Sequence, residues 1–174
     1  LHGELPDIPA RQRNLHTLFL HTWARLSPAE QAVFMRLAVF RGGMTPTAAM
    51  QAAGATPDVL AGLNDKALLW RRNGGGSERN GKGAGHKARY EVHELLRQFA
   101  EGQLAGRDTV EPGVRHAAEA AHSRYYLTLL AEQHVLLAGD TLRAALYTIR
   151  ADLENITAAW RWACREQTVD LLEP

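Results

Sequence analysis

The residues nearest to a known chemical motif lie in a glycine-rich run in the middle of the chain. Residues 76–83 have the sequence GSERNGKG, and the phosphate-binding loop has the pattern G-x-x-x-x-G-K-[ST], in which the final hydroxyl binds Mg²⁺. Gly83 occupies the hydroxyl position. The residues after it alternate like a strand, whereas the motif needs a helix N-terminus there. We therefore expect a flexible loop and not a nucleotide site.

Histidines and carboxylates give no sign of metal or acid–base chemistry. His16 and His21 are five residues apart, and His116 and His122 are six apart, whereas two metal ligands on one helical face are four apart. Carboxylates such as Glu30 fall on the polar faces of expected helices, as does Glu94, and we expect them to be solvated. No Ser/His/Asp or Cys/His arrangement is present, so we expect no catalytic residue and no metal site.

Charge and composition restrict the class of protein. The chain has 20 Lys and Arg against 19 Asp and Glu, and this balance gives no reason to expect a nucleic-acid or membrane partner. One cysteine, Cys164, excludes an internal disulfide and is consistent with a reducing cytosol. No apolar run approaches the ~18 residues that span a bilayer. The chain begins at Leu1 without a methionine, and we expect it to be a piece of a longer protein.

Three Ser/Thr-Pro pairs predict the starts of three short helices. Ser27-Pro28, Thr45-Pro46 and Thr56-Pro57 each place a capping hydroxyl before a proline at the first helical position. Glu30 completes a capping box with Ser27. Apolar residues at helical spacing predict a further helix over 11–26. Such short helices at sharp angles are typical of helix-turn-helix units.

Two strands and a long loop follow the helices. Residues 67–72 and 88–92 have the composition and alternation of strands, and residues 73–87 between them contain six glycines. Three helices followed by a long-looped hairpin describe a winged helix, in which the loop is the wing. The expected fold class is therefore mainly α, with a winged-helix domain over residues 1–107.

The charges of this expected domain leave DNA binding as a weaker possibility. A basic wing can contact the DNA backbone, and cations in and beside the loop outnumber acids. However, the expected recognition helix, 57–66, carries two aspartates against one lysine and no arginine to contact guanine. The cations are Arg71, Arg72, Arg79, Lys82, Lys87 and Arg89, against Glu78 and Glu91.

Longer helices are expected in the second half. Helical spacing resumes over 93–104, and glycines and a proline place a linker at 108–113. Two helices over about 114–137 and 140–166, the second with Asp140 as its N-cap, would form an α-helical hairpin. A repeat of near 34 residues would fit a tetratricopeptide (TPR)-like array, so residues 114–174 are expected to be the first helices of a truncated repeat domain.

Seven segments in combination carry a resemblance to a known family. They resemble the region after the nucleotide-binding domain of bacterial STAND-class signalling ATPases, the regulators related to MalT, AfsR-type activators and NB-ARC proteins. The resemblance covers nearly the whole chain and departs from the usual pattern in the long glycine-rich loop. The segments are Leu5-Pro6 with RQRNL (11–15), WARLSPAEQ (23–31), LAVFRGGMT (37–45), DKALL (65–69), YEVHELLRQFA (90–100), DLENI (152–156) and AAWRWA (158–163).

The resemblance implies a cytoplasmic, non-catalytic regulatory fragment. The winged helix would be an intramolecular clamp on an ADP-bound nucleotide domain that lies upstream, and the helical repeats would be a sensor for an unknown protein or ligand. The fragment itself would hold no cofactor, whereas ADP or ATP with Mg²⁺ is implied for the parent, which would oligomerise on activation. The alternative is a winged-helix DNA-binding transcription regulator with a helical dimerisation tail.

The resemblance also implies one binding residue. Val92-His93-Glu94 falls where relatives carry Met-His-Asp, whose histidine contacts the ADP phosphates, so His93 is implied as a phosphate contact in the parent. An imidazole donor at the first turn of a helix can hydrogen-bond phosphate oxygens, and the helix dipole adds to this attraction. The alternative is that His93 caps its own helix and packs on it.

Overall fold

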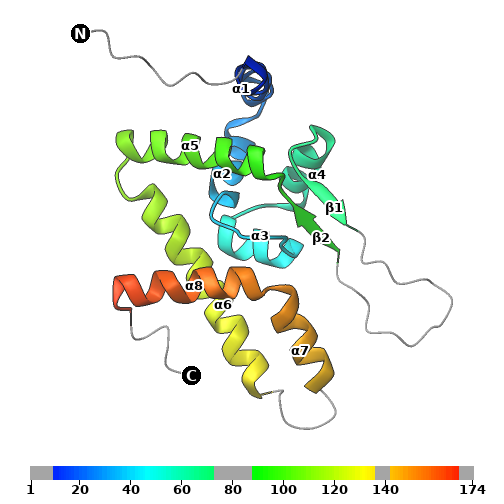
Figure 1. The fold of residues 1–174 in the computed structure, drawn as a ribbon, viewed down its shortest axis with the longest axis vertical. Helices are drawn as coiled ribbons and strands as arrows, with labels where there is room; N and C mark the ends of the chain where they lie inside the picture. The colour runs from blue at the N-terminus through cyan, green and yellow to red at the C-terminus, as the bar shows by residue number, and fades with distance from the viewer. Residues whose placement is uncertain (1–9, 73–87, 136–141, 169–174) are drawn as a thin grey trace, which may run out of the picture.

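The computed structural model describes residues 10–72, 88–135 and 142–168. Within these ranges the chain forms eight helices and a two-stranded antiparallel sheet, so the expected mainly helical fold with a small sheet is confirmed (Figure 1). The elements are α1 (Ala10–Ala24), α2 (Pro28–Leu37), α3 (Pro46–Ala53), α4 (Pro57–Asp65), β1 (Trp70–Arg72), β2 (Arg89–Glu91), α5 (Glu94–Val110), α6 (Val114–Val135), α7 (Leu142–Ala151) and α8 (Leu153–Glu166).

The three Ser/Thr-Pro helix starts are confirmed. The Ser27 hydroxyl accepts the Glu30 N–H at 3.2 Å, and Glu30 accepts the Ser27 N–H at 2.8 Å, which completes the capping box of α2. Thr45 and Thr56 cap α3 and α4 by the same type of hydrogen bond. Each cap satisfies a backbone N–H that the first turn leaves without a partner, so these starts depend only on neighbouring residues.

The expectation that the Glu30 carboxylate is solvated is wrong. Only 8% of this residue is exposed, because α4 packs against α2. The Lys66 ammonium lies 2.6 Å from its carboxylate, and this hydrogen bond is the largest of the contacts that lower the pKa of Glu30. Glu30 therefore links the start of α2 to the end of α4, in addition to its role as a cap.

The hairpin of β1 and β2 is short, and the segment before α3 also pairs with β2. Trp70 pairs with Glu91, and Arg72 pairs with Arg89. Tyr90 also exchanges both backbone hydrogen bonds with Met44, at 2.9 and 2.8 Å, so the connection between α2 and α3 runs beside β2. Residues 73–87, which contain the expected flexible loop and its phosphate-loop-like sequence, lie outside the described residues.

The helix after the hairpin is longer than expected. α5 continues past Leu104 and through Gly106 to Val110, so residues 108–110 of the expected linker are helical. Only residues 111–113 separate α5 from α6. The Asp108 carboxylate accepts the backbone N–H groups of Gly113 and Arg115, both at 3.0 Å. These bonds hold the turn between the two helices.

The expected single helix over 140–166 is two helices. α7 ends at Ala151 and α8 begins at Leu153, with a break at Asp152, where φ is −112° and ψ is 14°. The second half is therefore a group of three helices, in which α8 crosses α6 and packs on it (Figure 1). The expected N-cap Asp140 lies outside the described residues.

One apolar core continues through the described part of the chain. Phe34 and Phe40 from the N-terminal helices belong to the same cluster as Tyr126 on α6 and Trp162 on α8. The rings of Phe40 and Tyr126 lie 6.0 Å apart, edge to face. The helices α6 and α8 are thus packed directly on the N-terminal half and do not extend away from it.

Candidate functional site

His93 lies at the start of α5 and caps this helix. Its Nδ1 accepts the backbone N–H of Leu95 at 3.2 Å, and its exposed ring lies 5.9 Å from the ring of Trp70. His93 therefore caps its own helix, which was the alternative to phosphate binding. Because Nδ1 accepts a hydrogen bond, the ring proton of the neutral form belongs on Nε2, which remains a donor.

Glu94, beside it, is exposed but not simply solvated. Its carboxylate accepts hydrogen bonds from Arg97 at 2.6 Å and from Gln98 at 2.8 Å. The Arg97 hydrogen bond is the largest contribution that lowers the pKa of Glu94, to about 2. Glu94 is therefore held along α5 as an anion.

A buried polar group joins the two halves of the protein through Asn155 on α8. The Asn155 side-chain oxygen accepts the backbone N–H of Arg41 at 2.7 Å and pairs with His122 Nε2 at 3.2 Å. The Asn155 amide donates to the Gly43 carbonyl at 3.1 Å. Asn155 is only 1% exposed, and its contact with His122 is buried, whereas those with Arg41 and Gly43 are partly buried.

A second set of bonds reaches the same carbonyl from the hairpin. Arg89 in β2 donates to Gly43 O at 2.6 Å, and its guanidinium pairs with Asp152 at 2.7 and 3.3 Å. Asp152 is 5% exposed and occupies the break between α7 and α8. We call the group of Arg41, Gly43, Arg89, Asp152 and Asn155 the Asn155 junction.

The Asn155 junction was missed in the sequence, although its parts lie in or beside segments that carry the resemblance. A usable signal was present in α8. The buried positions 152, 155, 159 and 162 are three or four residues apart, and the first two are polar. A polar residue within an apolar stripe must find a hydrogen-bond partner when it is buried.

Two of the cations that suggested a basic hairpin form ion pairs within the protein. Arg89 points inward to Asp152, and Arg72 pairs with Glu91 at 2.8 Å. Arg71 is exposed, and Arg79, Lys82 and Lys87 lie outside the described residues. The described part of the hairpin therefore presents less free positive charge than its composition suggests.

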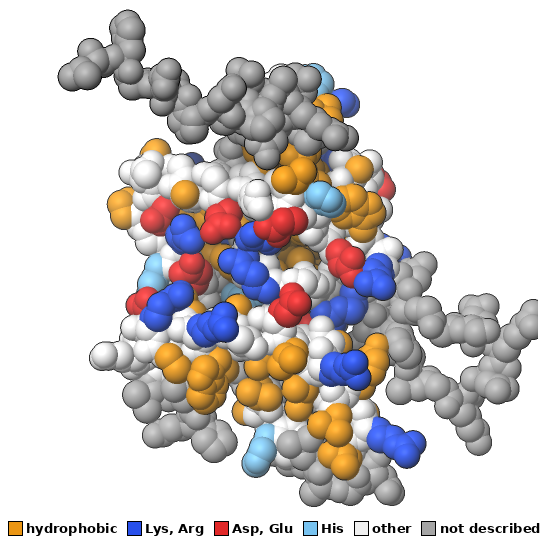
Figure 2. All heavy atoms as spheres, viewed as in Figure 1, with side chains coloured by type: hydrophobic (Ala, Val, Ile, Leu, Met, Phe, Trp, Pro, Cys, Tyr) orange, Lys and Arg blue, Asp and Glu red, His pale blue; other side chains and the backbone are white. Residues whose placement is uncertain are grey.

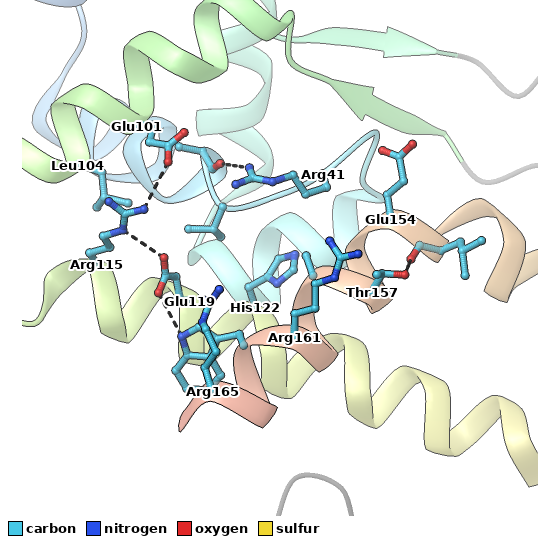
Figure 3. A pocket seen from close by; sticks show the side chains of 15 residues that line it. Arg41, Glu101, Leu104, Arg115, Glu119, His122, Glu154, Thr157, Arg161 and Arg165 are labelled. Atoms are coloured by element: carbon cyan, nitrogen blue, oxygen red, sulfur yellow. Dashed lines mark hydrogen bonds and ion pairs between the residues drawn. The ribbon is translucent and has the colours of Figure 1, made fainter. Parts of the chain in front are cut away.

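A cavity of about 530 Å³ lies beside the junction, between α8 and the segment that follows α2. Figure 2 shows charged side chains of both signs gathered on this face, and Figure 3 shows those that line the cavity. Four arginines and three glutamates contribute to the wall, together with the buried ring of His122. The charged residues are Arg41, Arg115, Arg161, Arg165, Glu101, Glu119 and Glu154.

His122 is neutral in this environment. Burial is the main cause that lowers its pKa to about 4, and the nearby charge of Arg41 acts in the same direction. Its Nε2 faces Asn155 Oδ1, which already accepts the Arg41 N–H, so Nε2 carries the proton. Nδ1 is then an acceptor on a residue that lines the cavity.

Metal, membrane and family comparisons add no assignment. Among the residues that the structure describes, no group of three or more His, Cys, Asp or Glu side chains is placed to hold a metal ion. No helix in the described ranges has the length and apolar character needed to cross a membrane. No family model, no curated protein and no solved structure matches the chain.

Proposed function

We propose that this chain is the regulatory part of a STAND-type signalling ATPase. A winged helix formed by α2–α5 and the hairpin would close on an ADP-bound nucleotide domain upstream, and α6–α8 would begin a TPR-like sensor arm. The observation that carries this proposal is the Asn155 junction, because it ties the arm to the segment after α2 and to β2.

The Asn155 junction supports a rigid coupling between arm and clamp. Fully satisfied buried polar contacts favour one arrangement of the elements that they join. Asp152 at the α7–α8 break holds Arg89, and His93 follows Arg89 by only four residues of chain. A displacement of the arm would therefore move the start of α5, where the proposed nucleotide contact lies.

His93 suits the role of a phosphate contact without belonging to the core. Its exposed ring keeps Nε2–H as a donor while Nδ1 caps α5. The position at a helix N-terminus adds a favourable dipole for an anion. Capping and phosphate binding use different ring nitrogens, so the two roles are compatible.

The outer face of α7 and α8 supports the sensor part of the proposal. Large apolar side chains are exposed there, and in a repeat array such a face packs against the next unit or a partner. These side chains are Leu142, Leu146, Tyr147 and Trp160.

The test compares two substitutions of His93 in the full-length parent. His93→Asp keeps a strong N-cap and places a carboxylate against the phosphates, whereas His93→Ala removes both the cap and the donor. Loss of one phosphate hydrogen bond, worth about 1–3 kcal/mol, should speed signal-independent ADP release by roughly 5–150-fold. His93→Asp should do so without lowering the melting temperature of this chain, and the matched control His134→Asp should leave release unchanged. Unchanged release in His93→Asp would contradict the clamp.

The salt dependence of DNA binding distinguishes the alternative function, a DNA-binding regulator, from the clamp. A winged-helix reader that neutralises several phosphates should bind duplex DNA with an affinity that falls steeply with log salt. The engaged Arg72 and Arg89 and the aspartates of α4 favour the opposite outcome. A steep salt slope that becomes shallower by about one unit on Arg71→Gln would replace the clamp by this alternative.

A further inference from the structure

We propose that the cavity beside the Asn155 junction binds a small organic anion that carries phosphate or carboxylate groups. The volume of about 530 Å³ lies within the range of ligand pockets, roughly 300–1,000 Å³. The walls come from both halves of the protein, namely the segment that follows α2 and the helices α5, α6 and α8. A single inorganic ion would fill only a small part of this space.

Arg41 supplies a positive charge without an acidic partner. Its guanidinium donates through one nitrogen to the carbonyls of Ala38 and Phe40, at 2.9 and 3.2 Å, at the C-terminal end of α2. It forms no ion pair with any carboxylate that the structure describes. The group is half-buried, and burial is the main cause that lowers its pKa. The charges of Glu101, Glu94 and Glu119 act on Arg41 without a direct ion pair. An anion in the cavity would supply the direct partner that its guanidinium lacks.

Two further arginines lie on the opposite wall. Arg161 and Arg165 are four residues apart on α8, so they share one face of the helix. Figure 3 shows both side chains extending from α8 toward the cavity, with Arg41 across from them. Neither forms an ion pair within the described ranges, and like charges at this spacing repel each other.

Most of the acidic groups in the wall are already used. Arg115 pairs with Glu101 at 3.3 Å and with Glu119 at 3.1 Å, and Trp162 Nε1 donates to Glu119 at 3.1 Å. Glu154 is the remaining carboxylate of the lining, and it is exposed. Among the described residues, three arginines of the wall therefore form no ion pair, against one glutamate that forms none.

The remaining lining indicates what else the anion carries. His122 Nδ1 is an acceptor, so it favours a ligand with a hydroxyl or amine donor. Leu104, Leu153 and Ala158 provide apolar wall for the ligand's carbon frame. Guanidinium groups bind phosphate and carboxylate in a two-pronged geometry, which accounts for the ligand class.

Calorimetric titration of the chain with pyrophosphate and with citrate tests the site. We expect saturable binding of one molecule for at least one of these anions, and which of them binds distinguishes phosphate from carboxylate chemistry. Arg161→Gln with Arg165→Gln should weaken binding by about 10-fold or more for each arginine. Both side chains are exposed, so the melting temperature without ligand should not fall.

The matched control is Arg143→Gln with Arg150→Gln, which removes the same charge from exposed arginines on α7 that do not line the cavity. This pair should leave the dissociation constant within about twofold, because exposed charges that are distant from a ligand are screened. Equal weakening by both double variants would mean general charge attraction and would overturn the site, as would no saturable binding of either anion. Binding is measured on the isolated chain, so its outcome is independent of the clamp, which is tested by ADP release.

Discussion

The side-chain oxygen of Asn155 accepts the backbone N–H of Arg41 at 2.7 Å, although 114 residues separate them in sequence. The same side chain donates to the carbonyl two residues further along, at Gly43. One amide thus satisfies a donor and an acceptor of the backbone between α2 and α3. Contacts with α8 and β2 therefore hold this segment in addition to its local hydrogen bonds.

Replacement of Asn155 should therefore destabilise the whole described fold. Asn155→Ala leaves the Arg41 N–H and the His122 ring without their partner in the interior, and we expect a loss of about 2–4 kcal/mol in the free energy of unfolding. Urea denaturation measures it. Glu154→Ala, the exposed neighbour on α8, is the control and should change the value by less than about 0.5 kcal/mol. Equal effects of the two would contradict the role of the junction.

The buried ion pair of the junction should contribute far more than the exposed one on the same hairpin. Asp152→Asn leaves Arg89 without its charge partner at a site where Asp152 is 5% exposed, and we expect a cost of about 3–5 kcal/mol. Glu91→Gln breaks the exposed pair with Arg72 and should have a much smaller effect. Thermal unfolding of the two single variants provides the comparison, and a similar drop in both would refute it.

Stability should fall as the pH drops from about 6.5 to about 4. Burial lowers the pKa of His122 to about 4, so the unfolded chain binds a proton in this window while the folded chain does not. Protonation of the unfolded state then favours unfolding, by up to about 3 kcal/mol over the window. The charge of Arg41 also lowers this pKa, whereas the Asn155 hydrogen bond, Glu119 and Asp152 raise it.

Unfolding measured at pH 7, 5.5 and 4.5 on the chain and on His122→Gln checks this dependence. The variant should lose most of the slope between the first two values, where carboxylates contribute little. His134→Gln, an exposed histidine on the same helix, should keep the slope. An unchanged slope in His122→Gln would assign the pH dependence to other groups.

The isolated chain should bind no Mg-ATP through its glycine-rich run. Gly83 cannot supply the hydroxyl that binds Mg²⁺ in a phosphate-binding loop. Equilibrium dialysis with labelled ATP should show no magnesium-dependent binding that involves Lys82, so Lys82→Ala should behave as the unchanged chain does. Binding that Lys82→Ala abolishes would contradict this.

The predictable parts of the fold are those set by neighbouring residues. Ser27, Thr45 and Thr56 each need only the N–H three positions later, so the sequence alone locates the helices that they start. The two strands and the helix after them were also expected, but the first strand begins at Trp70 and not at Ala67, which has a positive φ of 56°. The end of α5 was not expected, because Gly106 weakens a helix locally, whereas an Arg107–Glu111 ion pair and the Asp108 bonds to the next turn support its last residues.

The unpredicted parts depend on residues distant in sequence. The break at Asp152 has no proline or glycine, and it occurs where the carboxylate meets Arg89, 63 residues earlier. The charge of Arg89 was counted toward a solvated loop because sequence spacing does not show which way a strand residue points. His93 was placed correctly at a helix start, but its use of Nδ1 as the cap requires coordinates.

The distance between Arg41 and Asn155 along the chain also has a consequence for biosynthesis. Translation at roughly 5–20 residues per second needs roughly 6–22 s to add the 112 residues from Gly43 to Asn155. For that interval the nascent N-terminal helices have no α8 to accept the Arg41 N–H, and for most of it they lack the α6 rings that cover Phe40. The growing polypeptide therefore presents an open apolar edge, the kind of surface that chaperones bind, until these helices have been synthesised.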